Sequence, residues 1–168
     1  EDNSEGLGLD YDGKKCGSFA DITTLSFYAN KIVTTGEGGM VLCNKKSIYK
    51  RCLSIKNLFF KEPRFVHDEI GSNFRLTNLQ AALGLAQLET IKKSIKRKIE
   101  IGKLYNKLLE KISCINTPVK KNRYSENIYW VYGIILNDKC KLSKKIVMQK
   151  LKNQNLETRP FFSPMHTQ

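Results

Sequence analysis

The 168-residue sequence lacks any long apolar run. No stretch of eighteen or more apolar residues occurs, which excludes a transmembrane helix within these residues. No charged and then apolar segment of the kind that directs secretion opens the sequence. The composition of 40% hydrophobic and 10% aromatic residues is nevertheless enough to bury a core, so disorder of the whole chain is excluded too. We therefore expect one globular domain or parts of two.

The sequence also lacks paired cysteines. Its five cysteines are an odd number, none of them has CxxC spacing, and the two histidines, His67 and His166, lie far from any metal-like cluster. This pattern excludes a disulfide framework and a zinc site, and it predicts reduced thiols in a cytoplasmic protein without a bound metal.

Acidic residues are scarce, and the formal net charge of +13 results from 29 basic and 16 acidic residues. Such a surplus favours a nucleic-acid partner. However, most of the basic residues are lysines, which lack the planar fork of arginine. The densest cluster, Lys92–Lys98, has isoleucines at helical spacing, as expected of one solvated helix face. We predict neither a nucleic-acid nor a membrane partner, and a basic nucleic-acid-binding or interaction module remains the alternative.

Three runs predict strands. Ile22–Tyr28 and Gly39–Cys43 are β-prone and apolar, which favours strands covered on both faces. Tyr129–Leu136 predicts a third strand. The composition changes near residues 113–127, where we expect the chain to cross from one lobe to another. The sequence therefore predicts a mixed α/β structure.

Local capping signals predict the helices. Lys45–Ile55 is expected to be helical. Thr77 and Gln80 have the spacing of a capping box and predict the start of a long helix with a bend near Gly102. Ser143 is expected to cap a further helix that ends near residue 153.

One lysine follows the first predicted strand closely. Lys31 lies in a loop that is bounded by Ser26 and by the glycine-rich run Gly36–Gly39. A partly desolvated lysine can act as a nucleophile toward an aldehyde, and the Ser26 hydroxyl could bind a phosphate. Taken alone, the pattern is more typical of an ordinary surface lysine in a loop, and glycine-rich loops are common.

The string SFYANK…TTGEGGMV, residues 26–41, closely resembles the lysine motif of the DegT/StrS family of pyridoxal-phosphate (PLP) sugar-nucleotide aminotransferases. Three further blocks resemble that family in order and spacing: EDNSEGLG (1–8), HDEIGSNFRLTNLQAA (67–82) and TRPFF…PMH (158–166). The four blocks together extend over essentially the whole chain. The resemblance implies the aspartate-aminotransferase-like α/β fold, fold type I of PLP enzymes.

The resemblance also implies roles for five side chains in cofactor binding. Lys31 matches the catalytic lysine that binds the cofactor aldehyde covalently. Asp2 matches the carboxylate that keeps the pyridine nitrogen protonated, so that the ring remains an electron sink. Glu5 matches a position near the ring hydroxyl, and Ser26 matches a phosphate ligand. Asn73 matches a residue that reaches the cofactor of the neighbouring subunit, which implies a homodimer.

The implied reaction is transamination of a nucleotide-linked keto sugar, a 4-keto-6-deoxyhexose, with glutamate as the amino donor. A lysine at position 31, in place of the histidine of sugar dehydratase relatives, favours this reaction. Arg75, Arg159 and His166 match positions that could contact the sugar nucleotide. The segment Asn57–His67 looks most like the perosamine-synthase type.

Family members are considerably longer than this chain, which we therefore expect to be a fragment. Residues 1–113 match the C-terminal part of the PLP-binding large domain and its connecting helix, and residues 114–168 match part of the small domain. We expect the fragment alone to be inactive, and an inactive remnant is a further alternative. The chain departs from the family pattern at Asn3, Ser4 and Gly6, where the family usually has alanines, and at Ser72, where it usually has an aromatic residue. At these positions we expect looser packing.

Overall fold

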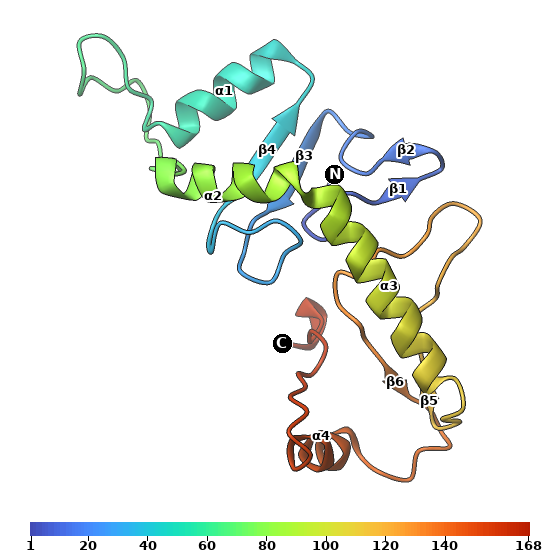
Figure 1. Ribbon diagram of the computed structural model, residues 1–168. Helices are drawn as coiled ribbons and strands as arrows, with labels where there is room; N and C mark the ends of the chain where they lie inside the picture. The colour runs from blue at the N-terminus through green and yellow to red at the C-terminus, as the bar shows by residue number, and fades with distance from the viewer. The chain divides into compact units, whose positions relative to one another are not determined.

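A computed structural model describes residues 1–168, which form two compact units. The first unit comprises Glu1–Glu100 and Lys121–Trp130, and the second comprises Ile101–Lys120 and Val131–Gln168. Helix α3 (Ile91–Leu109) begins in the first unit and ends in the second (Figure 1). No helix combines the length and the apolar character needed to span a bilayer.

The first unit is built on an antiparallel strand pair, β3 (Ile22–Ser26) and β4 (Gly39–Cys43). Ser26 lies opposite Gly39 at the end where the chain leaves β3. A Cβ atom at position 39 would lie 2.6 Å from the Leu25 carbonyl oxygen, so only glycine allows this approach. Both strands agree with the sequence prediction, except that the first ends at Ser26 rather than at Tyr28.

The core lies on one side of β3. Leu25, Phe27 and Val33 are buried, and Leu7 and Ile91 pack against them. Residues along β3 alternate between exposed and buried positions, as expected of a strand with one covered face.

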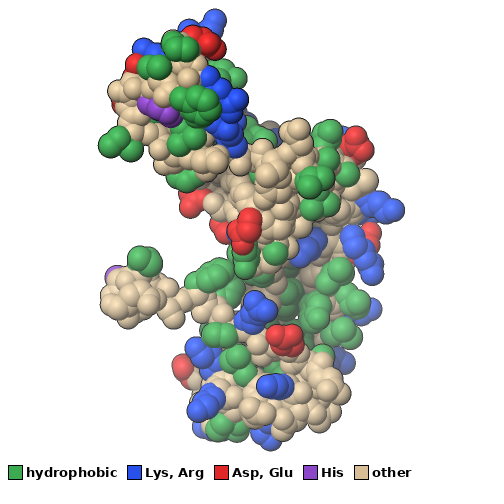
Figure 2. Space-filling model, turned by 90° about the vertical axis from the view of Figure 1, so that its left-hand side faces the viewer, with side chains coloured by type: hydrophobic (Ala, Val, Ile, Leu, Met, Phe, Trp, Pro, Cys, Tyr) green, Lys and Arg blue, Asp and Glu red, His purple; other side chains and the backbone are tan.

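The prediction that both strands are covered on both faces is wrong for this chain. In β4 all residues except the last are exposed, and Figure 2 shows many hydrophobic side chains on the visible surface. The accessible surface is 13253 Å², whereas a folded monomer of this mass exposes about 8500 Å². The 168 residues therefore leave uncovered much apolar surface that a protein core would normally bury.

Helix α1 (Lys46–Lys56) follows β4 and contacts it. Helix α2 (Asn78–Glu89) begins with the predicted capping box: the Gln80 amide donates to the Thr77 hydroxyl, and the Gln80 side chain accepts from the Thr77 amide. The bend predicted near Gly102 is wrong, because the helix breaks at Thr90 instead. Figure 1 shows the change of direction between α2 and α3.

The remaining elements are short. They are β1 (Asp10–Tyr11), β2 (Lys14–Lys15), β5 (Ile115–Asn116), β6 (Ile135–Leu136), α4 (Lys144–Lys152) and the 3-10 turn η1 (Met165–Thr167). β1 pairs with β2, and β5 pairs with β6, each in antiparallel orientation. Ser143 caps α4 as predicted, because its hydroxyl accepts from the Ile146 amide at 3.4 Å.

The predicted strand Tyr129–Leu136 is wrong over most of its length, since only Ile135 and Leu136 are in a strand. Tyr129 has φ of 51°, in the left-handed region that a strand does not permit. The Asn127 side chain accepts from the Tyr129 amide at 2.7 Å and stabilises this turn.

Candidate active site

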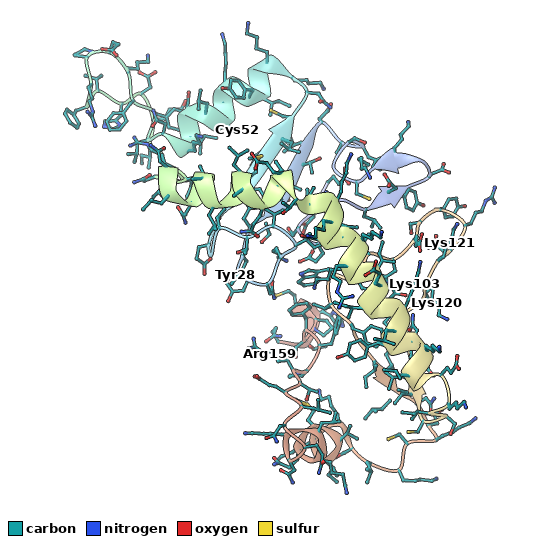
Figure 3. All side chains as sticks on the ribbon, viewed as in Figure 1. Tyr28, Cys52, Lys103, Lys120, Lys121 and Arg159 are labelled. Atoms are coloured by element: carbon teal, nitrogen blue, oxygen red, sulfur yellow. The ribbon has the colours of Figure 1, made fainter.

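The loop between β3 and β4 carries Lys31. The Phe27 amide donates to the Gly38 carbonyl at 2.9 Å, and the Thr35 amide donates to the Phe27 carbonyl at 2.9 Å. Within the loop, the Lys31 amide donates to the Tyr28 carbonyl at 3.0 Å. Tyr28 projects from the same loop (Figure 3). The loop is therefore closed at its base by backbone hydrogen bonds, and a tight turn places the lysine.

The Lys31 side chain has two partners. Its Nζ lies 2.5 Å from Glu5 Oε1 and 4.2 Å from the centroid of the Trp130 ring. Only 11% of the lysine side chain is exposed, against 48% of the Glu5 side chain. The ammonium group is thus held between a carboxylate and an aromatic ring and is largely withdrawn from solvent.

Asp2 lies alongside β3, where it forms a parallel bridge with Thr24. Its Oδ1 accepts from the Ser4 hydroxyl at 2.5 Å and from the Ser4 amide at 3.1 Å. These two hydrogen bonds lower the pKa of the Asp2 carboxyl, partial desolvation opposes them, and the positive charge of Lys31 lowers the pKa further. Asp2 is therefore ionised at neutral pH, and its Oδ2 remains available to another donor.

Ser26 is the last residue of β3 and is half-buried. Its hydroxyl oxygen accepts from the Tyr28 amide at 3.4 Å, which leaves the hydroxyl proton available to an anion. One end of β3 therefore presents an amine at Lys31, carboxylates at Asp2 and Glu5, and a hydroxyl at Ser26. This donor set fits PLP, which needs an amine for its aldehyde, an anion for its ring nitrogen and a hydrogen-bond donor for its phosphate.

Asn73 and Arg75 belong to a second cluster, centred on Asn57. Asn73 forms an antiparallel bridge with Asn57, and Arg75 Nε donates to the Asn57 side-chain oxygen at 2.6 Å. The Arg75 guanidinium also lies over the Phe60 ring, 5.5 Å from its centroid. Within this chain the structure therefore groups Asn73 and Arg75 with each other and not with the Lys31 cluster.

Arg159 and His166 lie in the second unit. Arg159 is exposed on the segment between α4 and η1 (Figure 3), and His166 lies in η1 and is also exposed. Among all 168 residues, no three histidine, cysteine, aspartate or glutamate side chains group as a possible metal site.

Helix α2 holds the loop that follows Lys31. The Gln87 side chain accepts from the Thr34 amide at 3.2 Å and donates to the Thr34 carbonyl at 2.7 Å. Gln80 donates to the Glu37 carbonyl at 3.1 Å. A Cβ atom at Gly84 would lie 2.9 Å from Thr35 Cγ2, so the helix and the loop are in close contact there. We call these contacts the α2 clamp.

Sequence reasoning missed three contributors to this region: Trp130, Ser4 and Gln87. Trp130 is ninety-nine positions from Lys31, so no local pattern could indicate their contact. The sequence marks Ser4 only as a departure from the family's alanine and does not indicate its hydrogen bonds with Asp2. The NLQAA string did single out the start of α2, but its capping signal says nothing about the Gln87 side chain.

The expectation of looser packing is wrong at Asn3. The residue is 5% exposed, and its Oδ1 would lie 2.1 Å from a Cβ atom at Gly6. The asparagine therefore fills the space that a side chain at position 6 would occupy. The Asn3 amide nitrogen Nδ2 is buried without a hydrogen-bond partner.

Comparisons with known proteins agree with this geometry. The model of the DegT/DnrJ/EryC1/StrS aminotransferase family matches residues 1–168. A GDP-perosamine synthase of Vibrio cholerae is 40% identical over 99% of this chain and 45% of its own length, and one of Escherichia coli O157:H7 is 42% identical over the same shares. PseC of Helicobacter pylori, an aminotransferase involved in the biosynthesis of pseudoaminic acid, superposes with a TM-score of 0.90 at 26% identity, over 98% of this chain and 45% of PseC.

Two predictions are confirmed by these matches. The first is the family that the four sequence blocks indicated. The second is the fold class, since the structure matches part of a fold type I aminotransferase. The chain spans about half the length of the curated relatives it matches.

Proposed function

Because the chain belongs to the DegT/DnrJ/EryC1/StrS aminotransferase family, we propose that it is part of a PLP-dependent aminotransferase that acts on a nucleotide-linked sugar. The observation that supports this most directly is the Lys31 site. A lysine that is 11% exposed and 2.5 Å from a carboxylate lies in the loop after β3. An ionised aspartate, whose pKa the lysine's charge lowers, pairs alongside that strand. A lysine largely withdrawn from solvent, beside an aspartate whose pKa is lowered, is a candidate for a catalytic centre.

The proposed roles follow from the donor set. When bound, PLP supplies an electron sink for the charge that develops at the amino donor's α-carbon. The Asp2 carboxylate holds a proton on the pyridine nitrogen, and the Ser26 hydroxyl binds the phosphate. Lys31 would hold the cofactor through its Nζ, and the same nitrogen, once free, would accept and return the proton that transamination moves. Glu5, which pairs with Lys31 Nζ, would hold the lysine side chain and is the proposed neighbour of the cofactor's ring hydroxyl.

For the substrates, we propose a nucleotide-linked 4-keto-6-deoxyhexose as amino acceptor and glutamate as amino donor. The relatives named GDP-perosamine synthase, at 40% and 42% identity, favour this class. Arg75, Arg159 and His166 are proposed contacts for the sugar nucleotide. All three are exposed and carry donors suited to phosphate or hydroxyl groups.

We further propose that the complete protein is a homodimer in which Asn73 reaches the neighbouring subunit's cofactor. Apolar side chains beside Asn73 support an interface at this place: Phe65, Ile70, Phe74 and Leu79 are 72%, 101%, 71% and 86% exposed. Exposed apolar side chains that gather in this way mark interaction surfaces. The Asn57-centred cluster lies within the same segment, so a partner that covers it would also meet Asn73 and Arg75.

We propose residues 1–113 as the end of the large PLP-binding domain and residues 114–168 as part of the small domain of a cytoplasmic enzyme. The uncovered apolar surface, including β4, supports the proposal that the 168 residues alone are inactive. The test is sugar transamination by the purified chain with glutamate and PLP. Measurable turnover would contradict this part of the proposal.

Covalent labelling tests the cofactor site itself. The chain is incubated with PLP, the imine is reduced with borohydride, and the labelled lysine is identified by peptide mass spectrometry. We expect label on Lys31 in preference to exposed lysines such as Lys45. Lys31→Arg should remove that label, whereas the matched variant Lys45→Arg should keep it. Uniform labelling of surface lysines would refute the assignment of Lys31.

A further inference from the structure

Trp130 contacts Lys31 in two ways. Its ring centroid lies 4.2 Å from Lys31 Nζ. Its indole Nε1 donates to the backbone carbonyl of Asn30 at 3.0 Å, one residue before the lysine. One side chain therefore contacts both the ammonium group of Lys31 and the backbone that carries it.

The position of Trp130 is itself fixed. Its carbonyl accepts from Lys98 Nζ on α3 at 2.9 Å. The two residues before it, Ile128 and Tyr129, are 7% and 3% exposed. Buried neighbours restrain the backbone on one side and a helix lysine restrains the carbonyl, so the ring is presented to Lys31 by an ordered segment.

A ring and a carboxylate hold an ammonium group differently. The negative face of an indole attracts a cation but cannot accept its proton. Glu5, in contrast, is a charged partner that is half exposed to solvent. Trp130 therefore restrains the direction of the lysine side chain and shields it from water without competing for the proton.

We propose that Trp130 is a positioning residue for Lys31, which it seats against its ring while it anchors the loop through the Asn30 carbonyl. The proposal rests on the proposed function, in which Lys31 is the residue that binds PLP. The geometry separates two contributions. Trp130→Phe keeps a ring face and loses the N–H donor, and Trp130→Leu loses both.

The first test is labelling of Lys31 with PLP and borohydride, quantified by peptide mass spectrometry. Because the lysine side chain is then no longer seated against a ring and its loop is no longer anchored through the Asn30 carbonyl, the initial labelling rate of Lys31 should fall severalfold in Trp130→Leu. The labelling rate in Trp130→Phe should lie between those of Trp130→Leu and the unchanged chain, because phenylalanine keeps a ring face for the lysine. Tyr11→Leu, which removes an exposed aromatic ring elsewhere in the same unit, is the matched control and should label as the unchanged chain does.

The second test needs no cofactor. Trp130 is the only tryptophan of the 168 residues, so its fluorescence reports on its surroundings. Lys31→Met should change the emission of the chain without PLP, because it removes a cation 4.2 Å from the ring. Lys45→Met, at an exposed lysine that pairs with Asp21, should not.

The outcomes separate the two proposals. Labelling of Lys31 in Trp130→Leu that is as fast as in the unchanged chain, or faster, would overturn the role of Trp130. An emission spectrum that Lys31→Met leaves unaltered would overturn it too. Absence of Lys31 label in the unchanged chain, together with the expected emission change, would instead contradict the cofactor role of Lys31 and support its contact with Trp130. Far-ultraviolet circular dichroism is the control that each variant is folded before its rate or spectrum is compared.

Discussion

The α2 clamp predicts a measurable loss of stability when Gln87 is changed to methionine. The Gln87 amide satisfies both the N–H and the C=O of Thr34, at 3.2 Å and 2.7 Å. Methionine has a similar length and a similar helix propensity, but it offers neither a strong donor nor a strong acceptor. The substitution therefore isolates the two hydrogen bonds from the helix itself.

The magnitude follows from the partial burial of both hydrogen bonds. Each is worth about 0.5–1.5 kcal/mol net, and a buried backbone group left without a partner costs about 1–3 kcal/mol. Because Thr34 is only half-buried, water can partly replace the lost partner. We expect Gln87→Met to lower the free energy of unfolding by about 2 kcal/mol, toward the lower end of the combined range.

Two measurements check this value. Urea unfolding should show a lower midpoint for Gln87→Met than for Glu89→Met, a matched substitution at an exposed position of the same helix. Hydrogen exchange at the Thr34 amide should become about 30-fold faster, since about 1.4 kcal/mol corresponds to tenfold. If both variants unfold at the same urea concentration and Thr34 exchange is unchanged, the clamp does not hold the loop and the reasoning fails.

Three other substitutions have defined outcomes. Ser4→Ala removes the main hydrogen bond that lowers the pKa of Asp2, so the pKa should rise in the variant. As pH falls, the Asp2 carboxylate is protonated when the pH reaches its pKa, and this happens at a higher pH in the variant. PLP affinity, measured by absorbance, should therefore decline at a higher pH in Ser4→Ala than in the unchanged protein. Thr77→Ala removes the cap of α2 and should lower the free energy of unfolding by about 1 kcal/mol, measured against Thr90→Ala. Gly84→Ala should destabilise the chain in urea, despite a helix preference for alanine of about 1 kcal/mol, because the new Cβ would lie 2.9 Å from Thr35; a gain in stability would contradict the close contact.

Elements whose signals are local could be predicted from the sequence. The capping box at Thr77, the cap at Ser143 and the two strands β3 and β4 depend on neighbouring residues. The structure places them as expected, apart from the first strand's final residues. The segment Tyr129–Leu136 has the composition of a strand, but a turn at Tyr129 and the contact of Trp130 with Asn30 override that preference. Contacts between residues far apart in the sequence therefore override the local strand propensity of this segment.

The candidate site shows the same division between local and distant information. The Lys31 loop has a dense motif, and the resemblance of four ordered blocks identified the family. Asp2 and Ser26 are brought to the same end of the sheet by the parallel bridge of Asp2 with Thr24. No local pattern indicates that bridge, because the partners are twenty-two positions apart in the chain. The resemblance to the family located those residues, and the structure explains why they converge.

The departures from the family pattern near Asp2 are physically coupled. Asn3 fills the space beside Gly6, where a Cβ atom would lie 2.1 Å from the asparagine Oδ1. An asparagine in this conformation at position 3 and an alanine at position 6 therefore exclude each other. Ser4 adds a hydroxyl donor at 2.5 Å from Asp2 that an alanine would lack. The exchange of three alanines for polar residues and glycine thus preserves the packing around Asp2 and strengthens its ionised form, so the block has to be understood as one unit rather than as three separate losses.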